Sequence, residues 1–200
     1  MKGTVVSAII LSAGYSSRMG AFKPLLQIGN TTLLERSVRL FQSAGVTDIR
    51  VVLGYRHADL EAILDRLGVP GVVNDRYDDG MFSSVVAGLR SINPGTTAFF
   101  VHPVDIPSVE RDTVISLLEA YERGEGDIIY PTFHGRRGHP PLVSTKYKTE
   151  IVNRLGPGGL RGVLRQYESR SSNVPVPDKH VLIDLDTPED YRLILTEYHK

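Results

Sequence analysis

The sequence contains no cysteine. Disulfide bonds, thiolate metal sites and cysteine nucleophiles are therefore excluded, and nothing indicates an oxidising compartment. The sequence also lacks any apolar stretch of the roughly 18 residues that a membrane-spanning helix needs. The first apolar run, residues 5–11, is too short for the core of a signal peptide. These absences predict a cytoplasmic protein with no membrane partner.

Charge of neither sign is in excess. Lys and Arg total 23, Asp and Glu total 23, and the formal net charge is zero. Such a balance gives no electrostatic reason to expect nucleic acid or a membrane surface as a partner. The chain has 200 residues, of which 41% are hydrophobic. This size and composition predict one globular domain over residues 1–200.

Segments with strand character alternate with segments of helical period. The run 5–11 is continuously apolar, as expected of a strand buried on both faces. The predicted strands are residues 5–11, 48–53, 71–74, 98–101, 127–130 and 181–185. The predicted helices run from the Thr32/Glu35 capping box to Gly45, over 57–67, over 83–90, from an N-cap at Ser108 to Glu122, and from Thr187-Pro188 to Tyr198. This alternation predicts an α/β fold, a Rossmann-like three-layer domain with a mostly parallel sheet that binds ligands beyond the carboxyl ends of its strands.

A loop rich in glycine, serine and positive charge follows the first predicted strand. It contains Gly14, Ser16, Ser17, Arg18, Gly20 and Lys23. Glycines let the backbone approach a ligand, hydroxyls and free amides bind anions, and two cations disperse phosphate charge. The loop is not a P-loop, because no Gly-Lys-Ser/Thr follows the glycines, and it lacks the Gly-x-Gly-x-x-Gly dinucleotide fingerprint. The residues alone leave two interpretations, a triphosphate-binding loop and a flexible surface loop with solvated cations.

The segment Ala13-Gly14-x-Ser16-x-Arg18-Met19-Gly20-x-x-Lys23-Pro24-Leu25 resembles the signature loop of the nucleotidyltransferases related to the molybdopterin cytidylyltransferases and guanylyltransferases. That family has the nucleotide-diphospho-sugar transferase fold. The resemblance implies that the loop holds the triphosphate of a nucleotide, with Arg18 and Lys23 on the phosphates as the catalytic cations. The nucleotide-binding residues that it implies in this loop are Leu11, Ser12, Ala13, Gly14, Ser16, Ser17, Arg18 and Lys23.

Two acidic residues follow predicted strands, Asp105 after residues 98–101 and Asp186 after residues 181–185. Mg²⁺ binds carboxylate oxygens together with substrate phosphates, whereas an aspartate in a loop is commonly a turn or cap residue. Asp105 resembles the metal-binding residue of the family's Asp-x-Pro motif, and Asp186 resembles the acidic residue before Thr-Pro in its closing motif. The resemblance therefore implies a Mg²⁺ site made by Asp105 and Asp186. Asp184 is the alternative second ligand, because strand alternation would place it on the same face as Asp186.

Residues 74–84 follow the third predicted strand and include Asn74, Gly80, Ser83 and Ser84. Amide and hydroxyl groups of this kind can bind the edge of a nucleobase. Spacing alone supports equally a structural interpretation, in which Asn74 ends a strand and Ser83 caps a helix. In the family that the chain resembles, this region lies around the base and ribose. Family members that use CTP tend to carry alanine at the position of Ala13, where GTP users carry glycine, so the resemblance favours CTP.

The segment from Arg136 to Pro140 resembles the Gly-His-Pro element that borders the family's acceptor site. The acceptor-binding residues that the resemblance implies are Arg136, Arg137, His139 and Arg161. Taken alone, a histidine before proline in a turn is more often structural than catalytic. The chain departs from the molybdopterin cytidylyltransferases at Pro157, which stands where an aspartate is expected and has no side-chain group that ligates a metal or accepts a hydrogen bond.

The resemblance extends from Val5 to Tyr191 and implies a nucleotidyltransferase that uses Mg²⁺. The expected reaction transfers a nucleoside monophosphate to a small phosphorylated acceptor such as molybdopterin and releases pyrophosphate, with CTP favoured as the donor. Positioning and charge neutralisation suffice for this chemistry, so no covalent nucleophile is needed. The alternatives are a sugar or alcohol phosphate as acceptor, and a non-catalytic nucleotide- or cofactor-binding protein. A molybdoenzyme or a chaperone is a candidate protein partner.

Overall fold

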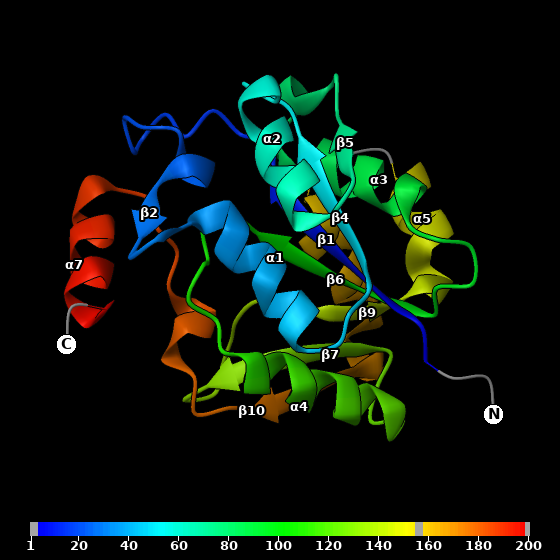
Figure 1. The fold of residues 1–200 in the computed structure, drawn as a ribbon. Helices are drawn as coiled ribbons and strands as arrows, with labels where there is room; N and C mark the ends of the chain where they lie inside the picture. The colour runs from blue at the N-terminus through cyan, green and yellow to red at the C-terminus, as the bar shows by residue number, and fades with distance from the viewer. Residues whose placement is uncertain (1–3, 155–157, 199–200) are drawn as a thin grey trace.

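The computed structural model describes residues 4–154 and 158–198, and a central β-sheet runs through this part of the chain (Figure 1). In chain order its strands are β1 (Val6–Ser12), β4 (Asp48–Leu53), β5 (Gly71–Val73), β6 (Ala98–Pro103), β7 (Ile128–Phe133), β8 (Arg136–Arg137), β9 (Leu142–Ser144) and β10 (Ser171–Pro175). Across the sheet the order is β10-β7-β9-β6-β1-β4-β5, with β8 beside β7. β1 is parallel to β4 and β6, β4 to β5, and β10 to β7, whereas β9 is antiparallel to both of its neighbours. The predicted mostly parallel sheet is confirmed.

Helices cover both faces of the sheet, which confirms the predicted three-layer α/β fold. One face carries α1 (Leu33–Ser43), α2 (Ala58–Leu67) and α4 (Arg111–Glu122), and the other carries α3 (Met81–Ser91), α5 (Lys148–Asn153) and α6 (Gly159–Leu164). Figure 1 shows α1 and α4 in front of the sheet. A small hairpin of β2 (Gln27–Ile28) and β3 (Thr31–Thr32) contacts the C-terminal helix α7 (Pro188–Tyr198). Along the described ranges, no helix is both long enough and apolar enough to cross a membrane.

Side-chain alternation along β1 divides the core into two layers. Ile10 belongs to the apolar cluster that contains Phe41 of α1 and Phe100 of β6. Its neighbour Ile9 belongs to the cluster on the other face, which contains Phe99. All five side chains are fully buried. The continuous apolar run of the first strand is therefore explained by helices on both faces of a central parallel strand.

The predicted helix ends are found at α1, α2 and α7. Thr32 Oγ1 accepts a hydrogen bond from the Glu35 N–H at 3.1 Å, and the Glu35 carboxylate accepts one from the Thr32 N–H at 2.8 Å, which is the predicted capping box. α2 ends at Gly68, whose φ of +67° is the left-handed conformation that glycine adopts readily. Thr187 caps α7 and accepts a hydrogen bond from the Asp190 N–H at 3.2 Å.

Helices α3 and α4 begin at positions other than those predicted. α4 begins at Arg111 and not after an N-cap at Ser108, which is buried. The carboxylate of Asp178, far away in the sequence, accepts a hydrogen bond of 2.8 Å from the N–H of the residue before Arg111 and takes over the capping role. α3 begins at Met81, so that Ser83 lies within its first turn.

The predicted strand over residues 181–185 is wrong. A 3-10 helix, Lys179–Leu182, forms its first half, and the segment that follows is outside the sheet. Val181 and Leu185 are fully buried in the core. Their apolar character therefore reflects core packing and not strand pairing. The Leu185 N–H donates to the Asp105 carbonyl at 2.8 Å, which ties this segment to the loop after β6.

Candidate active site

A cavity of about 390 Å³ opens at the carboxyl end of β1. Its wall is formed by the loop after β1, the 3-10 turn Tyr77–Asp79 (η2), the start of α3 and the residues after β6. The predicted site residues that line it are Leu11, Ser12, Ala13, Gly14, Ser16, Ser17, Arg18, Lys23, Gly80, Ser84 and Asp105. The lining residues outside the predicted set are Tyr15, Pro24, Tyr77, Asp78, Met81, Pro103 and Val104. The cavity lies where a parallel sheet is expected to bind its ligand.

Four charged side chains form a cluster beside this cavity. Nζ of Lys23 is 3.0 Å from Oδ2 of Asp105 and 2.9 Å from Oδ1 of Asp186. Nη1 of Arg18 is 2.7 Å from the other oxygen of Asp186. The side chain of Lys23 is 9% exposed and that of Arg18 is 72% exposed. This ion cluster therefore has one cation fixed in the protein and one that reaches out from the surface.

The members of the ion cluster stabilise each other's charges. Burial disfavours the ammonium form of Lys23, but the hydrogen bond to Asp186 and the charge of Asp105 outweigh it, so the pKa of Lys23 is raised. The hydrogen bond from Lys23 holds the pKa of Asp186 below its usual range against the opposing effect of burial, and the charge of Arg18 adds to this. Lys23 and Asp186 therefore stay charged at neutral pH.

Backbone hydrogen bonds bring the two acidic residues together. The loop that carries Asp105 is joined to β1, because the Val104 N–H donates to the Leu11 carbonyl at 3.0 Å. The bond between Leu185 and the Asp105 carbonyl then places the next residue, Asp186, beside the same loop. The Asp186 N–H donates in turn to the carboxylate of Asp190 in the first turn of α7, at 3.1 Å. The start of α7 therefore positions one half of the acidic pair.

The loop after β1 is held in shape by its own groups. The Lys23 N–H donates to Ser16 Oγ at 3.1 Å, and the Met19 N–H donates to the Ser16 carbonyl at 3.1 Å. Met19 is buried and anchors the loop to the core. Ser16 has a φ of 60°, a left-handed conformation that costs a residue with a side chain about 1 kcal/mol or more. Ser16, predicted as a phosphate ligand, thus also fixes the conformation of the loop.

Asp105 and Asp186 are suitable ligands for a divalent cation. Their oxygens converge on one ammonium group, so the fold already places them around a shared positive charge. An oxygen donor set of this kind suits Mg²⁺. The alternative ligand Asp184 is exposed and forms no ion pair with Lys23 or Arg18. The residues present therefore fit Mg²⁺, with Asp186 and not Asp184 in contact with Lys23.

A second cavity, of about 730 Å³, adjoins the first. The two cavities share the wall residues Leu11, Met81 and Pro103. The predicted acceptor residues that line the second cavity are Arg137, His139 and Arg161. Arg136 is exposed and is not part of this wall as far as the described residues form it. It precedes Arg137 on β8, where successive side chains point to opposite sides.

Arg137 is tightly held at the wall of the second cavity. Its two Nη atoms donate to the carboxylate of Glu168 at 2.9 and 2.6 Å, and its Nε donates to Asn173 at 2.7 Å. The guanidinium carbon also lies 4.4 Å from the ring centroid of Tyr130. An anionic ligand would therefore meet Arg137 already neutralised by Glu168.

Burial keeps two histidines at or near the second cavity in their neutral form. Burial lowers the pKa of His139, and the charges of Asp184 and Asp105 only partly oppose it. His102, in β6, is fully buried, and burial lowers its pKa to about 3. The ring of His102 packs edge-on against Phe41 at 5.4 Å. His102 was not predicted as a site residue, because nothing in an apolar strand signals it.

The predicted base-binding residues divide into two pairs. Asn74 is buried, and its amide donates to the hydroxyls of Ser83 at 2.8 Å and Ser84 at 3.0 Å. The Ser83 hydroxyl donates onward to the Gly80 carbonyl at 2.8 Å. Of these four described residues, Gly80 and Ser84 line the first cavity. Asn74 and Ser83 hold the turn together; Asn74 directly follows the end of β5, as the structural interpretation expected, whereas Ser83 lies inside α3 and does not cap it.

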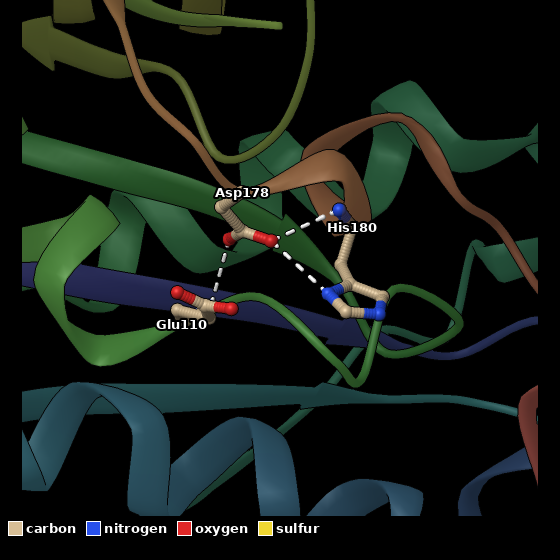
Figure 2. A group of neighbouring side chains, drawn as sticks. All are labelled: Glu110, Asp178 and His180. Atoms are coloured by element: carbon tan, nitrogen blue, oxygen red, sulfur yellow. Dashed lines mark hydrogen bonds and ion pairs between the residues drawn. The ribbon is translucent and has the colours of Figure 1, made fainter. Parts of the chain in front are cut away.

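A second cluster of potential metal ligands lies elsewhere, at the start of α4. Glu110, Asp178 and His180 bring one ligand atom each within 4.8 Å of one another (Figure 2). Both oxygens of Asp178 are already in use. Oδ2 accepts hydrogen bonds from the Glu110 N–H and from Thr113 Oγ1, and Oδ1 accepts one from the His180 N–H and lies 3.1 Å from His180 Nδ1. The contacts of Asp178 therefore support a structural role.

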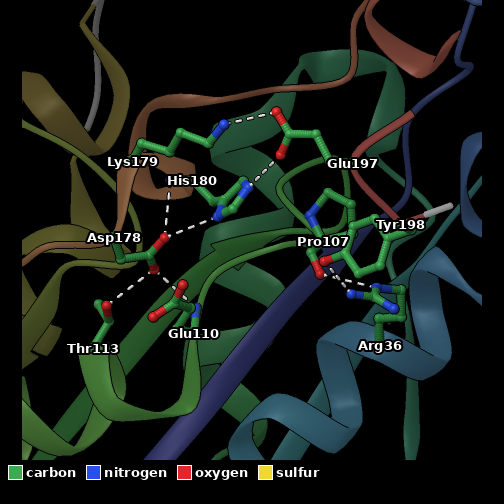
Figure 3. A network of polar contacts seen from close by, with 9 residues as sticks. All are labelled: Arg36, Pro107, Glu110, Thr113, Asp178, Lys179, His180, Glu197 and Tyr198. Atoms are coloured by element: carbon green, nitrogen blue, oxygen red, sulfur yellow. Dashed lines mark hydrogen bonds and ion pairs between the residues drawn. The ribbon is translucent and has the colours of Figure 1, made fainter. Parts of the chain in front are cut away.

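This cluster continues into a network that fastens α7 (Figure 3). Nε2 of His180 is 3.0 Å from the Glu197 carboxylate, which Lys179 also contacts at 2.7 Å. Arg36 of α1 contacts the Tyr198 hydroxyl at 2.5 Å, and its guanidinium carbon lies 4.4 Å from that ring centroid. The hydrogen bond to Asp178 raises the pKa of His180 more than burial lowers it. The network anchors the C-terminal end of α7, the helix whose first turn positions Asp186 through the hydrogen bond to Asp190.

Comparisons with known proteins agree with this geometry. A family model described as "MobA-like NTP transferase domain" matches residues 8–171, so the chain belongs to this family and is a nucleotidyltransferase. Molybdenum cofactor cytidylyltransferase of Escherichia coli (strain K12) is 28% identical over 189 residues, with 94% of each chain covered. Nicotine blue oxidoreductase of Paenarthrobacter nicotinovorans is 28% identical over 200 residues, with 94% of this chain and 96% of the relative covered. The crystal structure of Rv0371c from Mycobacterium tuberculosis H37Rv gives a TM-score of 0.81 at 25% identity, with 98% of this chain and 100% of that one covered.

The family prediction from the signature loop is thus confirmed. Pro157, the position at which the chain departs from the molybdopterin cytidylyltransferases, lies outside the described residues.

Proposed function

We propose that this protein transfers CMP from CTP to a small phosphorylated acceptor such as molybdopterin, in a Mg²⁺-dependent reaction that releases pyrophosphate. The observation that carries the proposal is the ion cluster at the carboxyl end of β1, beside two adjoining cavities with different linings. The similarity to a molybdenum cofactor cytidylyltransferase over most of both chains supports the choice of nucleotide and acceptor.

The nucleotide would occupy the first cavity, with its phosphates on the loop after β1. An oxygen of the acceptor phosphate attacks the α-phosphorus of the nucleotide, a new P–O bond forms, and the bond to pyrophosphate breaks in line with it. Lys23 and Arg18 neutralise charge on the phosphate oxygens as the transition state forms. Asp105 and Asp186 would hold Mg²⁺, which adds positive charge at the phosphates when bound.

The acceptor would occupy the second cavity. Arg161 and Arg165 line it one helical turn apart and can meet the acceptor's phosphate. Phe82 and Leu164 add apolar wall against which the face of a flat ring can pack. His139, neutral because of burial, can accept or donate a single hydrogen bond there. A sugar or alcohol phosphate is the alternative acceptor, and delivery of the product to a molybdoenzyme or a chaperone would follow from a molybdopterin acceptor.

The test is pyrophosphate release measured with each of the four nucleoside triphosphates against a panel of phosphorylated acceptors, molybdopterin included. The proposal expects CTP with molybdopterin and Mg²⁺ to give the highest kcat/KM, and expects Asp105→Asn to remove it. Nucleotide binding without release of pyrophosphate from the nucleotide, whichever acceptor is supplied, would support the non-catalytic alternative. A sugar or alcohol phosphate as the best acceptor would replace molybdopterin and leave the reaction class intact.

A further inference from the structure

The first cavity has two chemically different ends. The loop after β6, with Asp105, bounds one end, and η2, which follows β5, bounds the other. In the sheet, β6, β1, β4 and β5 are consecutive neighbours. Three spacings of about 4.8 Å put the two ends about 14 Å apart. Because the ion cluster marks the β6 end as the phosphate end, the nucleobase of a bound nucleotide would lie toward η2.

The end of the cavity at η2 presents a carboxylate and aromatic rings. The Tyr15 hydroxyl donates a hydrogen bond to Oδ1 of Asp78. The Tyr15 ring lies 5.4 Å from the ring of Tyr77 and 5.0 Å from that of Tyr55, measured between centroids. Asp79 forms an ion pair with Arg76 at 2.6 Å, whereas no ion pair neutralises Asp78 among the described residues. The cavity thus has a free negative charge at the end opposite to its cations.

Close packing fixes this end of the cavity. A Cβ added at Gly54 would lie 2.7 Å from Cγ of Tyr77 and 2.8 Å from the Ala13 carbonyl oxygen. The same carbonyl accepts a hydrogen bond from the Tyr55 N–H at 3.1 Å. The loop after β4, the loop after β1 and η2 are therefore in direct contact. Asp78 consequently has a defined position relative to the loop that would hold the phosphates.

We propose that Asp78, oriented by Tyr15, is a specificity residue that selects a nucleobase with an exocyclic amino group. This inference rests on the proposed function of the first cavity. A carboxylate only accepts hydrogen bonds, and with Oδ1 taken by Tyr15 the other oxygen is left to accept one from the ligand. Cytosine presents its N4 amino group to such an acceptor, and guanine presents its N2 amino group. Uracil presents the O4 carbonyl oxygen where cytosine has the amino group, and that oxygen repels a carboxylate.

The ribose hydroxyls are the competing donors for Asp78. Acidic residues bind ribose hydroxyls in dinucleotide sites. The two possibilities differ in what they discriminate. A base contact separates CTP from UTP, whereas a ribose contact separates CTP from dCTP and leaves CTP and UTP equal.

The experiment is equilibrium binding by titration calorimetry in Mg²⁺, without acceptor, of CTP, UTP, GTP and dCTP. We expect wild type to bind CTP about tenfold to a hundredfold more tightly than UTP, which is the range for a hydrogen bond to a charged group. Asp78→Asn should lower the affinity for CTP by a similar factor and leave the affinity for UTP unchanged or higher. Tyr15→Phe should reduce the ratio of the CTP affinity to the UTP affinity by a smaller factor, because the Asp78 carboxylate stays but loses the hydrogen bond that orients it.

Asp79→Asn is the matched control, since Asp79 is one residue away and paired with Arg76. It should leave the ratio between CTP and UTP unchanged. Equal wild-type affinity for CTP and UTP would overturn the inference. So would an Asp78→Asn variant that loses the same factor of affinity for all four nucleotides, or one that loses affinity for CTP and UTP alike but not for dCTP. Each of these outcomes still includes nucleotide binding and leaves the proposed function standing. Failure of wild type to bind any nucleotide would instead refute the proposed function itself.

Discussion

Lys23 contacts both acidic residues of the ion cluster, and Lys23→Met removes its charge while keeping most of its volume. The ammonium group forms two ion pairs, of 3.0 and 2.9 Å, and its side chain is 9% exposed. Removal of one preorganised electrostatic contact to a transition state costs about 10²–10³ in kcat. This corresponds to about 2.7–4 kcal/mol of activation free energy. We expect a loss of turnover in that range.

The same substitution has a consequence for metal binding that does not depend on turnover. Without the ammonium group, the carboxylates of Asp105 and Asp186 lose their shared cation, and only the exposed Arg18 remains beside Asp186. In this variant Mg²⁺ no longer competes with the Lys23 ammonium group for the two carboxylates. Mg²⁺ should therefore raise the Tm of Lys23→Met more than it raises the Tm of wild type.

Two measurements test this reasoning, pyrophosphate release at saturating substrates and thermal melts over a magnesium titration. Lys146→Met is the matched control, because Lys146 is also paired with an aspartate, Asp127, but is 47% exposed and outside both cavity walls as described. The control should keep wild-type turnover and the wild-type response to Mg²⁺. A tenfold or smaller loss of turnover in Lys23→Met, with an unchanged melt, would show that Lys23 is a spectator.

Three further predictions concern other parts of the molecule. Asp105→Asn should abolish activity at every Mg²⁺ concentration while leaving the Tm close to that of wild type, because a loop carboxylate supports no core; near-normal turnover would exclude Asp105 as a metal ligand. The pKa of His180 is raised above its ordinary value of about 6.5, so its stabilisation is present below that pH and is lost as the pH rises through the raised value. The Tm of wild type should accordingly fall above about pH 6.5 more steeply than that of His180→Gln, and parallel curves would refute this. Ala13 is buried in the wall of the first cavity, and under the proposed function its methyl group would lie beside the base of the bound nucleotide, so CTP should exceed GTP in kcat/KM by about tenfold to a hundredfold. Ala13→Gly should narrow that ratio, and an unchanged ratio would remove the steric explanation.

Local sequence signals were sufficient to predict helix ends whose capping groups are close neighbours in the sequence. The capping box of Thr32 and Glu35 and the left-handed Gly68 are formed within one turn, so spacing alone predicts them. β10 gives no such signal. It is an edge strand with the sequence SSNVP, which within the described ranges pairs with β7 alone and is partly exposed along its length, so it needs no apolar pattern. The apolar run that contains Val181 led to the wrong prediction of a strand over 181–185. A buried 3-10 helix shows the same apolar character as a buried strand, so the pattern alone does not distinguish them.

The site divides in the same way. The loop after β1 is contiguous, so its residues could be assigned together from one motif. The pairing of Lys23 with Asp186 joins positions 163 residues apart, and only the tertiary structure shows it. Arg136 and Arg137 could not be separated without knowing that β8 exists, because it is the strand alternation that sends one of them to the cavity. Asp78 lies within the segment that the resemblance assigned to the base, but at a position that the family motif leaves open.

A net charge of zero does not conflict with a site for polyanionic substrates, because a cation at each cavity is paired with carboxylates of the protein. Lys23 is neutralised by Asp105 and Asp186, and Arg137 is neutralised by Glu168. Ligand binding at Lys23 or at Arg137 therefore replaces one anionic partner of the cation with another, and does not bring an anion to an unpaired charge. Such an exchange makes little net change in paired charge, so affinity depends on how well the ligand's oxygens replace those of the carboxylates. Selection by geometry instead of by bulk charge is what a small phosphorylated substrate needs and what a nucleic acid backbone would not require.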